Sequence, residues 1–358
     1  MVDVVENTLQ ITPEWLTGAL KSEGLLKSRV TSVRHEVVGV GVGLMAELAR
    51  LAVEYEGPED LPATFIAKCA ARNENRAFAQ GLDFYNRETN FYSKIGQDCP
   101  FRVPKSYFGE VNQSTYDFVL LMEDLGDVAP NDQITGSSEA EAFDKARKIA
   151  ELHARFWNRV HEPENGWMYD MMSDAAAQKL RDMVYAPALE PAIVCSPFLF
   201  SPASIELVRK VGERYVETLA QVSPALSYIH GDFRQDNFIY QDGDNEAVVM
   251  DWQISGKGYP IFDLTYFVCQ SLQVPLRRQI ERDLVATYVE TLAENGVTYD
   301  MDTAWQDYRI LTLVCLIYPI SVCGTLDTAN ERGRRLAECM LDRNLSVIDD
   351  LNCGELVL

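Results

Sequence analysis

The stretch that most constrains this chain is a polar run near its middle, residues 230–237, with the sequence HGDFRQDN. Residues of these types suit an irregular loop better than a helix interior, because short polar side chains hydrogen-bond to nearby backbone and compete with regular structure. Asp232 and Asn237 stand five residues apart, and Asp251 follows fourteen residues after Asn237. A fold for this chain must therefore place the side chains of Asp232 and Asn237 on irregular backbone.

The residues between Asn237 and Asp251 have the pattern of a β-hairpin. Two short apolar runs, 238–240 and 247–250, flank the turn sequence QDGDN, which is typical of a hairpin connection. A hairpin folds back on itself, so it would return Asp251 close to Asn237. One carboxylate and one amide oxygen beside a second carboxylate, Asp232, would make a hard-oxygen site suited to Mg²⁺ and to phosphate bound with it.

The order HGDxxxxN, hairpin, then an Asp opening the pair DW resembles the aminoglycoside phosphotransferase and choline-kinase-like family, a branch of the protein-kinase-like fold. The resemblance implies that the first Asp orients the acceptor hydroxyl and takes its proton, while the Asn and the second Asp hold magnesium. By position, Asp232 would be the catalytic carboxylate, and Asn237 and Asp251 would be the metal ligands. The alternative is a turn-rich loop whose Asp and Asn side chains cap local backbone, but both halves of the motif in the right order favour the phosphotransferase.

The length, hydrophobic content and net charge of the chain limit its size class and the kinds of partner that it can bind. The chain has 358 residues, 47% of them hydrophobic, which is enough for one large or two ordinary domains. The net charge of −22, from 54 acidic and 32 basic residues, argues against a nucleic-acid partner and against an anionic membrane, because both need a positive face. An acidic surface keeps a protein soluble, and it would also favour a cationic acceptor.

The expected location is cytoplasmic. The eight cysteines are scattered, without a CxxC pair, and several lie in apolar runs, as buried free thiols do in a reducing compartment. The N-terminal sequence MVDVVENTLQ lacks the basic start and the long apolar stretch of a signal peptide. The apolar run at 311–322 is too short to span a membrane and contains Pro319, so a buried helix is the better interpretation.

The sequence pattern in the first third of the chain predicts a lead-in helix at 12–27, followed by a five-stranded antiparallel sheet. The helix opens with Thr-Pro-Glu, a capped start. A glycine cluster that includes Gly41 and Gly43 joins the first two strands, and such a turn could lay backbone amides over phosphates. Its spacing differs from the GxGxxG of protein kinases, and an ordinary hairpin turn explains it equally well. The strands are expected at 33–40, 47–55, 63–70, 102–110 and 116–122.

Two lone charges in this region are expected to pair. Lys68 lies inside an apolar strand, and Glu88 lies in the middle of an apolar stripe at helical spacing. A buried ammonium and a buried carboxylate each need an opposite charge. In the resembled family such a strand lysine contacts the nucleotide phosphates and pairs with a helix glutamate. The alternative places Glu88 at the edge of the stripe, facing water.

The last expected strand of the sheet runs into LLMEDLG at 120–126. By resemblance this is the hinge between two lobes, where backbone groups near Glu123 and Leu125 receive the adenine, whereas the residues alone show a strand followed by an acidic turn. The predicted division is an N-terminal nucleotide-binding lobe, 1–125, and a C-terminal catalytic and acceptor-binding lobe, 126–358. The fold class is therefore α+β: a protein-kinase-like two-lobe fold with a small antiparallel sheet plus helix and a larger, mainly helical lobe.

The second lobe is expected to be mostly helical, with loops and short helices in the proline-containing stretch 163–202. His153 shares an apolar stripe and is expected to be a packing residue. Asp263 is expected to cap its helix or to tie down loop backbone. The helices are expected at 138–157, 204–222, 276–295, 301–322 and 330–351.

The combined prediction is an enzyme that transfers the γ-phosphoryl group of ATP, with Mg²⁺, to a hydroxyl of a small molecule. Arg234, two residues beyond Asp232, would add positive charge at the transferring group. Gly231 replaces the Arg of the protein-kinase HRD motif and no APE sequence follows, so a protein substrate is disfavoured. The alternatives are a nucleotide-binding pseudokinase-type module without turnover, and a metal-dependent phosphohydrolase, which would not need a lysine-bearing strand.

Overall fold

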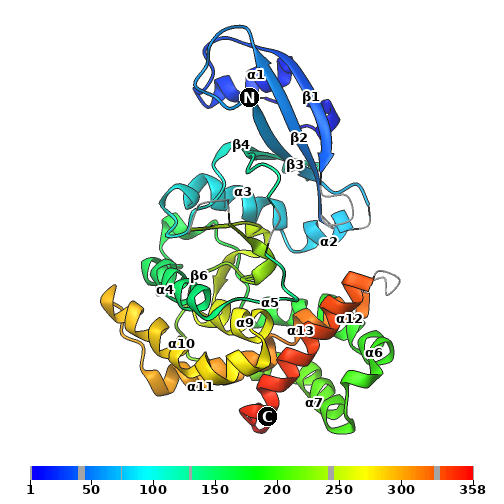
Figure 1. Cartoon of the computed structure of the whole chain (residues 1–358), viewed down its shortest axis with the longest axis vertical. Coiled ribbons are helices and arrows are strands. Elements are labelled where there is room, and N and C mark those ends of the chain that lie inside the picture. The colour runs from blue at the N-terminus through cyan, green and yellow to red at the C-terminus, as the bar shows by residue number, and fades with distance from the viewer. Residues whose placement is uncertain are drawn as a thin grey trace. The chain divides into compact units, whose positions relative to one another are not determined.

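The chain folds into two compact units, seen in the computed structural model that describes residues 2–38, 45–73, 75–128, 131–240, 246–325 and 331–357. The first unit comprises Met1–Ala129 and Ile239–Ile254, and the second comprises Pro130–Phe238 and Ser255–Leu358. The chain therefore leaves the second unit, contributes a hairpin to the first and returns (Figure 1). Sequence alone had assigned that hairpin to residues 126–358.

The first unit contains the predicted five-stranded antiparallel sheet, with the strand order β1-β2-β3-β5-β4. It is preceded by α1 (Pro13–Ser22), whose N-cap Thr12 accepts a hydrogen bond from the backbone of Trp15. The fourth strand begins at Ser106 instead of residue 102, because Pro104 lacks the N–H that a strand ladder needs. The strands are β1 (Val30–Val38), β2 (Ala46–Tyr55), β3 (Thr64–Ala70), β4 (Ser106–Val111) and β5 (Phe118–Glu123).

The two faces of this sheet differ in chemistry. Successive side chains of a strand point to opposite faces, and one face packs with α1 into a hydrophobic core that includes Ala49, Phe65 and Leu121. The other face carries Lys68, which stands opposite Leu48 in the register of β2 and β3. Gly41 and Gly43, the candidate phosphate-covering glycines, lie outside the described residues.

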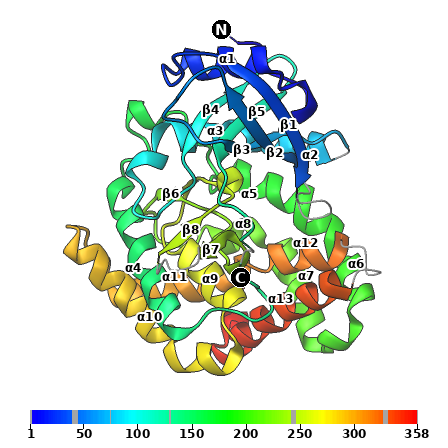
Figure 2. The ribbon, with the colours of Figure 1, turned by 45° about the horizontal axis from the view of Figure 1, so that its top comes forward.

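The hairpin contributed by residues 239–254 packs within the first unit. Strands β7 (Phe238–Tyr240) and β8 (Ala247–Val249) pair as predicted, and both are labelled in Figure 2. The ring of Trp252 stacks on Phe91 of α3 (Phe84–Lys94), with 3.7 Å between ring centroids. The backbone N–H of Val249 donates to the carbonyl of Arg102 at 2.8 Å. These contacts fix the chain on either side of Asp251.

The second unit is mainly helical, as predicted, with one short sheet of β6 (Ser227–Ile229) and β9 (Gly256–Gly258). The stretch 163–202 forms loops and short helices, as predicted, and Pro187 and Pro202 lie at helix starts, where a missing N–H costs no hydrogen bond. The helices are α4 (Glu139–Phe156), α5 (Asp174–Leu180), α6 (Ala186–Cys195), α7 (Pro202–Glu213), α8 (Tyr215–Leu219), α9 (Phe262–Ser271), α10 (Val274–Glu294), α11 (Met301–Val314), α12 (Ile317–Thr325) and α13 (Glu331–Asp350). In the first unit, α2 (Asn75–Gly81) precedes α3.

One segment, Met301–Gly324, is long and apolar enough to be considered for a membrane span by length and composition. It consists of two helices, α11 and α12, and 72% of its apolar window is buried inside the structure. The helices α9 and α13 pack against α11. This burial is the behaviour of a core segment, as expected for the apolar run at 311–322.

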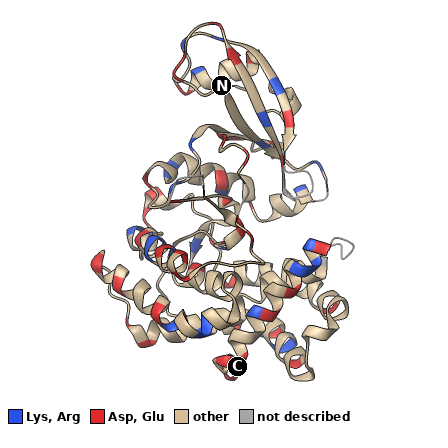
Figure 3. Cartoon of the chain, in the orientation of Figure 1, with Lys and Arg blue, Asp and Glu red and all other residues tan. Residues whose placement is uncertain are grey.

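Charged side chains are spread along the chain. Figure 3 shows acidic and basic residues interspersed on the helices of the second unit and on the strands of the first. The excess of acid, which gives a net charge of −22, is therefore distributed over both units.

Candidate active site

Lys68 of β3 and Glu88 of α3 form a buried ion pair in the first unit. The Lys68 Nζ donates to the Glu88 Oε1 at 2.8 Å, and the two residues are 8% and 1% exposed. The predicted pairing is confirmed, and the alternative with Glu88 facing water is wrong. Burial opposes the charged ammonium, but the attraction of Glu88 and of Asp251 outweighs it and raises the pKa of Lys68. The lysine is therefore a permanent cation.

Asp251 is the second carboxylate on this lysine. Its Oδ1 accepts from the Lys68 Nζ at 3.3 Å, and its Oδ2 accepts from the Gln253 side chain at 3.2 Å. The backbone of Asp251 has φ 62°, in the left-handed region that Asp tolerates better than most residues. Its side chain is 33% exposed. The lysine thus joins one buried acid to one acid that solvent can reach.

The loop 230–237 of the second unit is held at its start by Asp263 of α9. The Asp263 carboxylate accepts from the backbone N–H groups of His230 at 2.7 Å and Gly231 at 2.8 Å. His153 lies within hydrogen-bonding distance of Asp263 and of the Tyr288 hydroxyl, which confirms it as a packing residue. Gly231 has φ 81°, a conformation that glycine adopts without strain. The prediction that Asp263 ties down loop backbone is confirmed.

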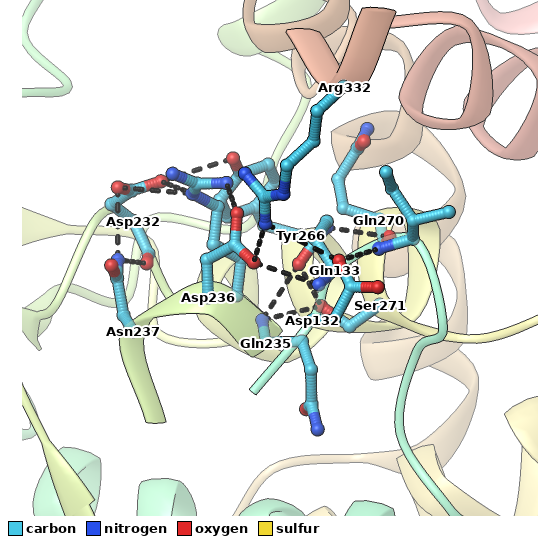
Figure 4. A network of polar contacts seen from close by, with 12 residues as sticks. Asp132, Gln133, Asp232, Gln235, Asp236, Asn237, Tyr266, Gln270, Ser271 and Arg332 are labelled. Carbon is cyan, nitrogen blue, oxygen red and sulfur yellow. Dashed lines mark hydrogen bonds and ion pairs between the residues drawn. The ribbon is translucent and has the colours of Figure 1, made fainter. Parts of the chain in front are cut away.

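The Asp232 carboxylate has donors on both oxygens (Figure 4). The Tyr266 hydroxyl donates to Oδ1 at 3.1 Å, and the Asn237 Nδ2 donates to Oδ2 at 3.0 Å and to the Asp232 carbonyl at 2.7 Å. Asp232 is 8% exposed. Burial and the nearby Asp232 charge raise the pKa of Tyr266 well above its ordinary value, so this phenol stays a donor. The carboxylate is therefore fixed in orientation by the surrounding side chains.

Arg234 lies between two acids of the same loop. Its Nε is 3.3 Å from the Asp232 Oδ1, and its Nη1 is 3.0 Å from the Asp236 Oδ2. Asp236 also accepts from the backbone of Gln133 at 2.8 Å and lies 3.9 Å from Arg332 of α13 (Figure 4). The guanidinium charge is thus already compensated by two carboxylates. Its contribution to phosphoryl transfer stays a prediction.

The C-terminal half of the loop 230–237 is held by hydrogen bonds of Gln235 to Gln133, Ser271 and Lys145. The Gln235 N–H reaches the Gln133 Oε1 at 2.9 Å and the Ser271 Oγ at 3.0 Å. Its side-chain oxygen accepts from the Lys145 Nζ at 3.1 Å. Gln133 in turn donates to the carbonyl of Gln270 at 2.7 Å. A loop over-determined in this way can hold its polar side chains ready for charge that develops in a reaction.

The hinge candidates Glu123 and Leu125 lie at and just after the end of β5, in the first unit. The Glu123 carboxylate accepts from Arg102 at 2.9 Å and from the backbone of Lys105 at 3.1 Å. The structure therefore places the predicted residues in two groups. Lys68, Glu88, Glu123, Leu125 and Asp251 lie in the first unit, and Asp232, Arg234 and Asn237 lie in the second.

The predicted magnesium ligands have the right donor atoms. Because the Asn237 amide nitrogen donates to Asp232, its Oδ1 points elsewhere, and it accepts no hydrogen bond from a described residue. Asp251 adds a partly exposed carboxylate. Within the described ranges no three His, Cys, Asp or Glu side chains gather into a metal-binding group. Asn237 lies in the second unit and Asp251 in the first, and their role as magnesium ligands stays a prediction.

Sequence reasoning missed two residues that contact the predicted site segments: Tyr266 donates to Asp232, and Arg50 donates to Asp124. Tyr266 lies three residues after Asp263 on α9, and helical residues at that spacing share a face, so the loop contact of Asp263 could have pointed to it. Arg50 is a lone cation within the apolar strand β2, the same signal that identified Lys68. The Tyr266 hydroxyl contacts the predicted catalytic loop 230–237, and the Arg50 guanidinium contacts the predicted hinge 120–126.

Comparison with known proteins identifies the fold. A choline kinase from Cryptosporidium parvum superposes with a TM-score of 0.54 at 12% identity, covering 89% of this chain and 90% of that one. A choline kinase from Streptococcus pneumoniae gives 0.52 at 16% identity, with 91% and 96% covered. The GDP complex of an aminoglycoside 2′-phosphotransferase IIIa gives 0.53 at 15% identity, with 95% and 99% covered. No curated protein sequence matches.

These likenesses confirm the predicted α+β class, the protein-kinase-like fold and the resemblance to choline kinases and aminoglycoside phosphotransferases. The fold is that of small-molecule kinases. The ecdysteroid kinase-like family matches residues 41–298, more than half of the sequence, including the stretch from Lys68 to Asp251 and on to Tyr266. The chain belongs to the ecdysteroid kinase-like family.

Proposed function

We propose that the protein is an ATP- and magnesium-dependent phosphotransferase that moves the γ-phosphoryl group to a hydroxyl of a small molecule. The observation that carries this proposal is the Lys68 ammonium held by Glu88 and Asp251. A buried ion pair contributes little net stability over well-packed apolar residues. Perturbed charges with specific partners cluster at functional sites, so a role in binding phosphate accounts better for this lysine.

The nucleotide would lie along the Lys68 face of the sheet. Lys68 stands opposite Leu120 of β5, and Glu123 follows three residues later, about 10 Å along the strand. Phosphates at Lys68 would therefore leave the adenine within reach of backbone groups near Glu123 and Leu125. Magnesium, held by Asn237 and Asp251, would supply positive charge that neutralises the phosphate oxygens.

Asp232 would act on the acceptor. A carboxylate fixed by Tyr266 and Asn237 can accept a hydrogen bond from a hydroxyl, align it with the phosphoryl group and take its proton late in the transfer. Arg234 could add positive charge there by exchanging one of its carboxylate partners for phosphate oxygen, since a guanidinium offers five donors. Orientation and charge neutralisation would supply most of the catalysis.

The acceptor is expected among hydroxyl-bearing small molecules. The family is described as ecdysteroid kinase-like, and structural neighbours are described as choline kinases and an aminoglycoside phosphotransferase. The net charge of −22 would favour a cationic alcohol through long-range attraction. All eight cysteines are free thiols, as expected in the cytoplasm, where we place the protein.

The test is an ATP-consumption screen with Mg²⁺ against an ecdysteroid, choline, an aminoglycoside and related alcohols, with products followed by mass. Acceptor-dependent turnover is expected, and Asp232→Asn should lower its rate about a hundredfold or more with little change in ATP affinity. Asp182→Asn, which alters an exposed carboxylate paired with Arg181, is the matched control.

Three results would contradict this proposal. Full turnover by Asp232→Asn would remove Asp232 from the catalytic role. ATP binding without turnover across the panel would favour a pseudokinase-type module. Inorganic phosphate without a phosphorylated product would favour a phosphohydrolase.

A further inference from the structure

The sheet face that carries Lys68 also bears a second cation, Arg50 of β2. In the register of β2 and β3, Arg50 pairs with Ile66 and Leu48 pairs with Lys68. Because residues two apart on a strand share a face, Arg50 and Lys68 lie on the same side of the sheet. The intervening Ala49 and the following Leu51 belong to the hydrophobic core on the opposite side. Arg50 therefore lies outside the core, on the sheet face along which the nucleotide is proposed to bind.

Arg50 grips the segment that follows β5. Its Nε donates to the Asp124 Oδ2 at 2.8 Å and its Nη2 donates to the Asp124 Oδ1 at 3.3 Å, while its Nη1 lies 2.8 Å from the Asp127 Oδ1. A two-pronged guanidinium–carboxylate pair fixes orientation as well as distance. The Asp124 side chain is 7% exposed and that of Asp127 is 91% exposed. The Asp124 contact is thus the stronger of the two, because exposed pairs contribute little.

Asp124, which Arg50 holds in place, also binds the backbone of the turn that follows it. Its Oδ1 accepts from the N–H of Gly126 at 3.0 Å, and Gly126 has φ 82°. Burial opposes the charged form of Asp124, but the hydrogen bonds from Gly126 and Arg50 hold its pKa below the ordinary value. One ionised carboxylate therefore closes the turn 124–126 and anchors it to β2. Without Arg50 this carboxylate would be left largely buried without its cation, which is strongly unfavourable.

The other end of the segment is held independently. The Glu123 N–H donates to the Lys105 carbonyl at 2.8 Å, and its carboxylate accepts from Arg102 at 2.9 Å. Residues 123–126 are thus held at one end by Arg102, through Glu123, and at the other by Arg50, through Asp124 and its hydrogen bond from Gly126. A short stretch of backbone fixed at both ends keeps the direction of its N–H and C=O groups.

We propose that Arg50 is a positioning residue for the nucleotide base: through Asp124 it holds the backbone of residues 123–125 in the conformation that receives the base. This inference rests on the proposed function, which takes that stretch as the base-binding one. It assigns Lys68 and Arg50 to opposite ends of one ligand. Lys68 acts on the phosphates, and Arg50 acts on the base without touching it.

The experiment separates the base from the phosphates. Dissociation constants of MgATP and of magnesium tripolyphosphate, which has the phosphates but no base, are measured by calorimetry for wild type, Arg50→Ala and Arg50→Lys. We expect Arg50→Ala to weaken MgATP about tenfold and to leave tripolyphosphate unchanged. Arg50→Lys keeps the charge but not the fork, so it should weaken MgATP about threefold.

Two further variants serve as controls. Arg29→Ala removes an arginine of the same unit from an exposed pair with Glu56, and Asp127→Asn removes the exposed partner of Arg50. Both should bind the two ligands as wild type does. If Arg50→Ala does not fold, as judged by circular dichroism, the Arg50→Lys variant decides.

The inference is overturned if the Arg50 variants bind MgATP like wild type, or if they lose both ligands to the same extent, since the second result would mean general damage. Failure of the wild type to bind MgATP is a different result, because it would contradict the proposed function and remove this inference with it. Loss confined to MgATP supports the inference.

Discussion

At the scale of single residues, the carboxylate of Asp232, the proposed catalytic residue, is held in one orientation by its neighbours. The Tyr266 hydroxyl and the Asn237 amide each donate to a different oxygen, so the plane of the carboxylate cannot rotate without losing a hydrogen bond. The Tyr266 ring also stacks on Tyr318 with 4.0 Å between centroids, and Tyr318 donates to the Gly231 carbonyl. Tyr266 is thereby fixed by packing as well as by its hydroxyl.

Tyr266→Phe tests whether this fixed orientation of the Asp232 carboxylate matters for turnover. The variant keeps the ring and its stacking but removes the donor to the Asp232 Oδ1. We expect kcat for formation of the phosphorylated acceptor to fall about tenfold. Without the Tyr266 hydroxyl, the Asp232 carboxylate would spend less time in the orientation that accepts the proton of the acceptor. The KM values for ATP and acceptor should stay close to wild type. The measurement is steady-state kinetics with the acceptor found in the screen.

The matched control is Tyr299→Phe, which removes another buried tyrosine hydroxyl that donates to a carboxylate, Asp307, at 2.6 Å. It should lower stability without changing kcat. A normal kcat for Tyr266→Phe, or an equal loss of kcat in both variants, would show that the Tyr266 hydroxyl has no special role at Asp232.

Sequence predicted some of these residues and not others for a physical reason. Lys68 and Glu88 each interrupt an apolar pattern, so the cost of burying a charge made their pairing predictable. Tyr266 left no such trace, because all residues of α9 are buried and an aromatic residue there looks like core. Its partner lies 34 residues earlier in the chain. Its spacing from Asp263 puts it on the same helix face, but the contact of its hydroxyl with Asp232 depends on tertiary packing that local patterns do not contain.

At the scale of elements, α4 shows both what local sequence specifies and what it leaves open. The helix starts after Ser138, which forms a capping box with Glu141, as the sequence predicted to within a residue. Its stripe also buries Lys145, which is 1% exposed and lies 4.5 Å from the Phe238 ring centroid. Burial lowers the pKa of Lys145 to about 8. Sequence gave no reason to expect a buried cation here.

Lys145→Met should change how stability depends on pH. An unfolded lysine holds its proton up to about pH 10.4, whereas folded Lys145 releases it near pH 8. Between these values the unfolded state binds more protons, so wild-type stability gains as pH rises, by at most on the order of 3 kcal/mol. The variant lacks this gain. Its free energy of unfolding relative to wild type should therefore fall between pH 8 and pH 10.

The measurement is urea denaturation of both proteins at pH 7, 8, 9 and 10. Other titrating groups contribute equally to the two proteins, so they cancel in the difference. A difference that stays constant over this range would mean that Lys145 keeps its ordinary pKa when folded, and that its hydrogen bond to Gln235 compensates for burial.

At the scale of the whole molecule, the chain is interleaved: the first unit includes residues 239–254, which interrupt the second unit near its middle. This could not be predicted from the order of patterns along the sequence, which suggested lobes at 1–125 and 126–358. The hairpin was predictable from its turn and its apolar runs. That the hairpin belongs to the first unit was not predictable. This depends on contacts such as the stacking of Trp252 on Phe91, two residues that are 161 apart in the chain.

A fragment ending at residue 129 should therefore be incompletely folded. It would expose Phe91 and leave the buried Lys68–Glu88 pair without Asp251. Joining 239–254 to its end by a glycine–serine linker should restore cooperative thermal unfolding and protease resistance. Trp252 is fully buried, so Trp252→Ala in the joined fragment should remove about 3–5 kcal/mol and abolish the gain. Equal cooperativity of the fragments with and without 239–254 would mean that the sheet and α3 are self-sufficient, and that the hairpin serves only to bring Asp251 to Lys68.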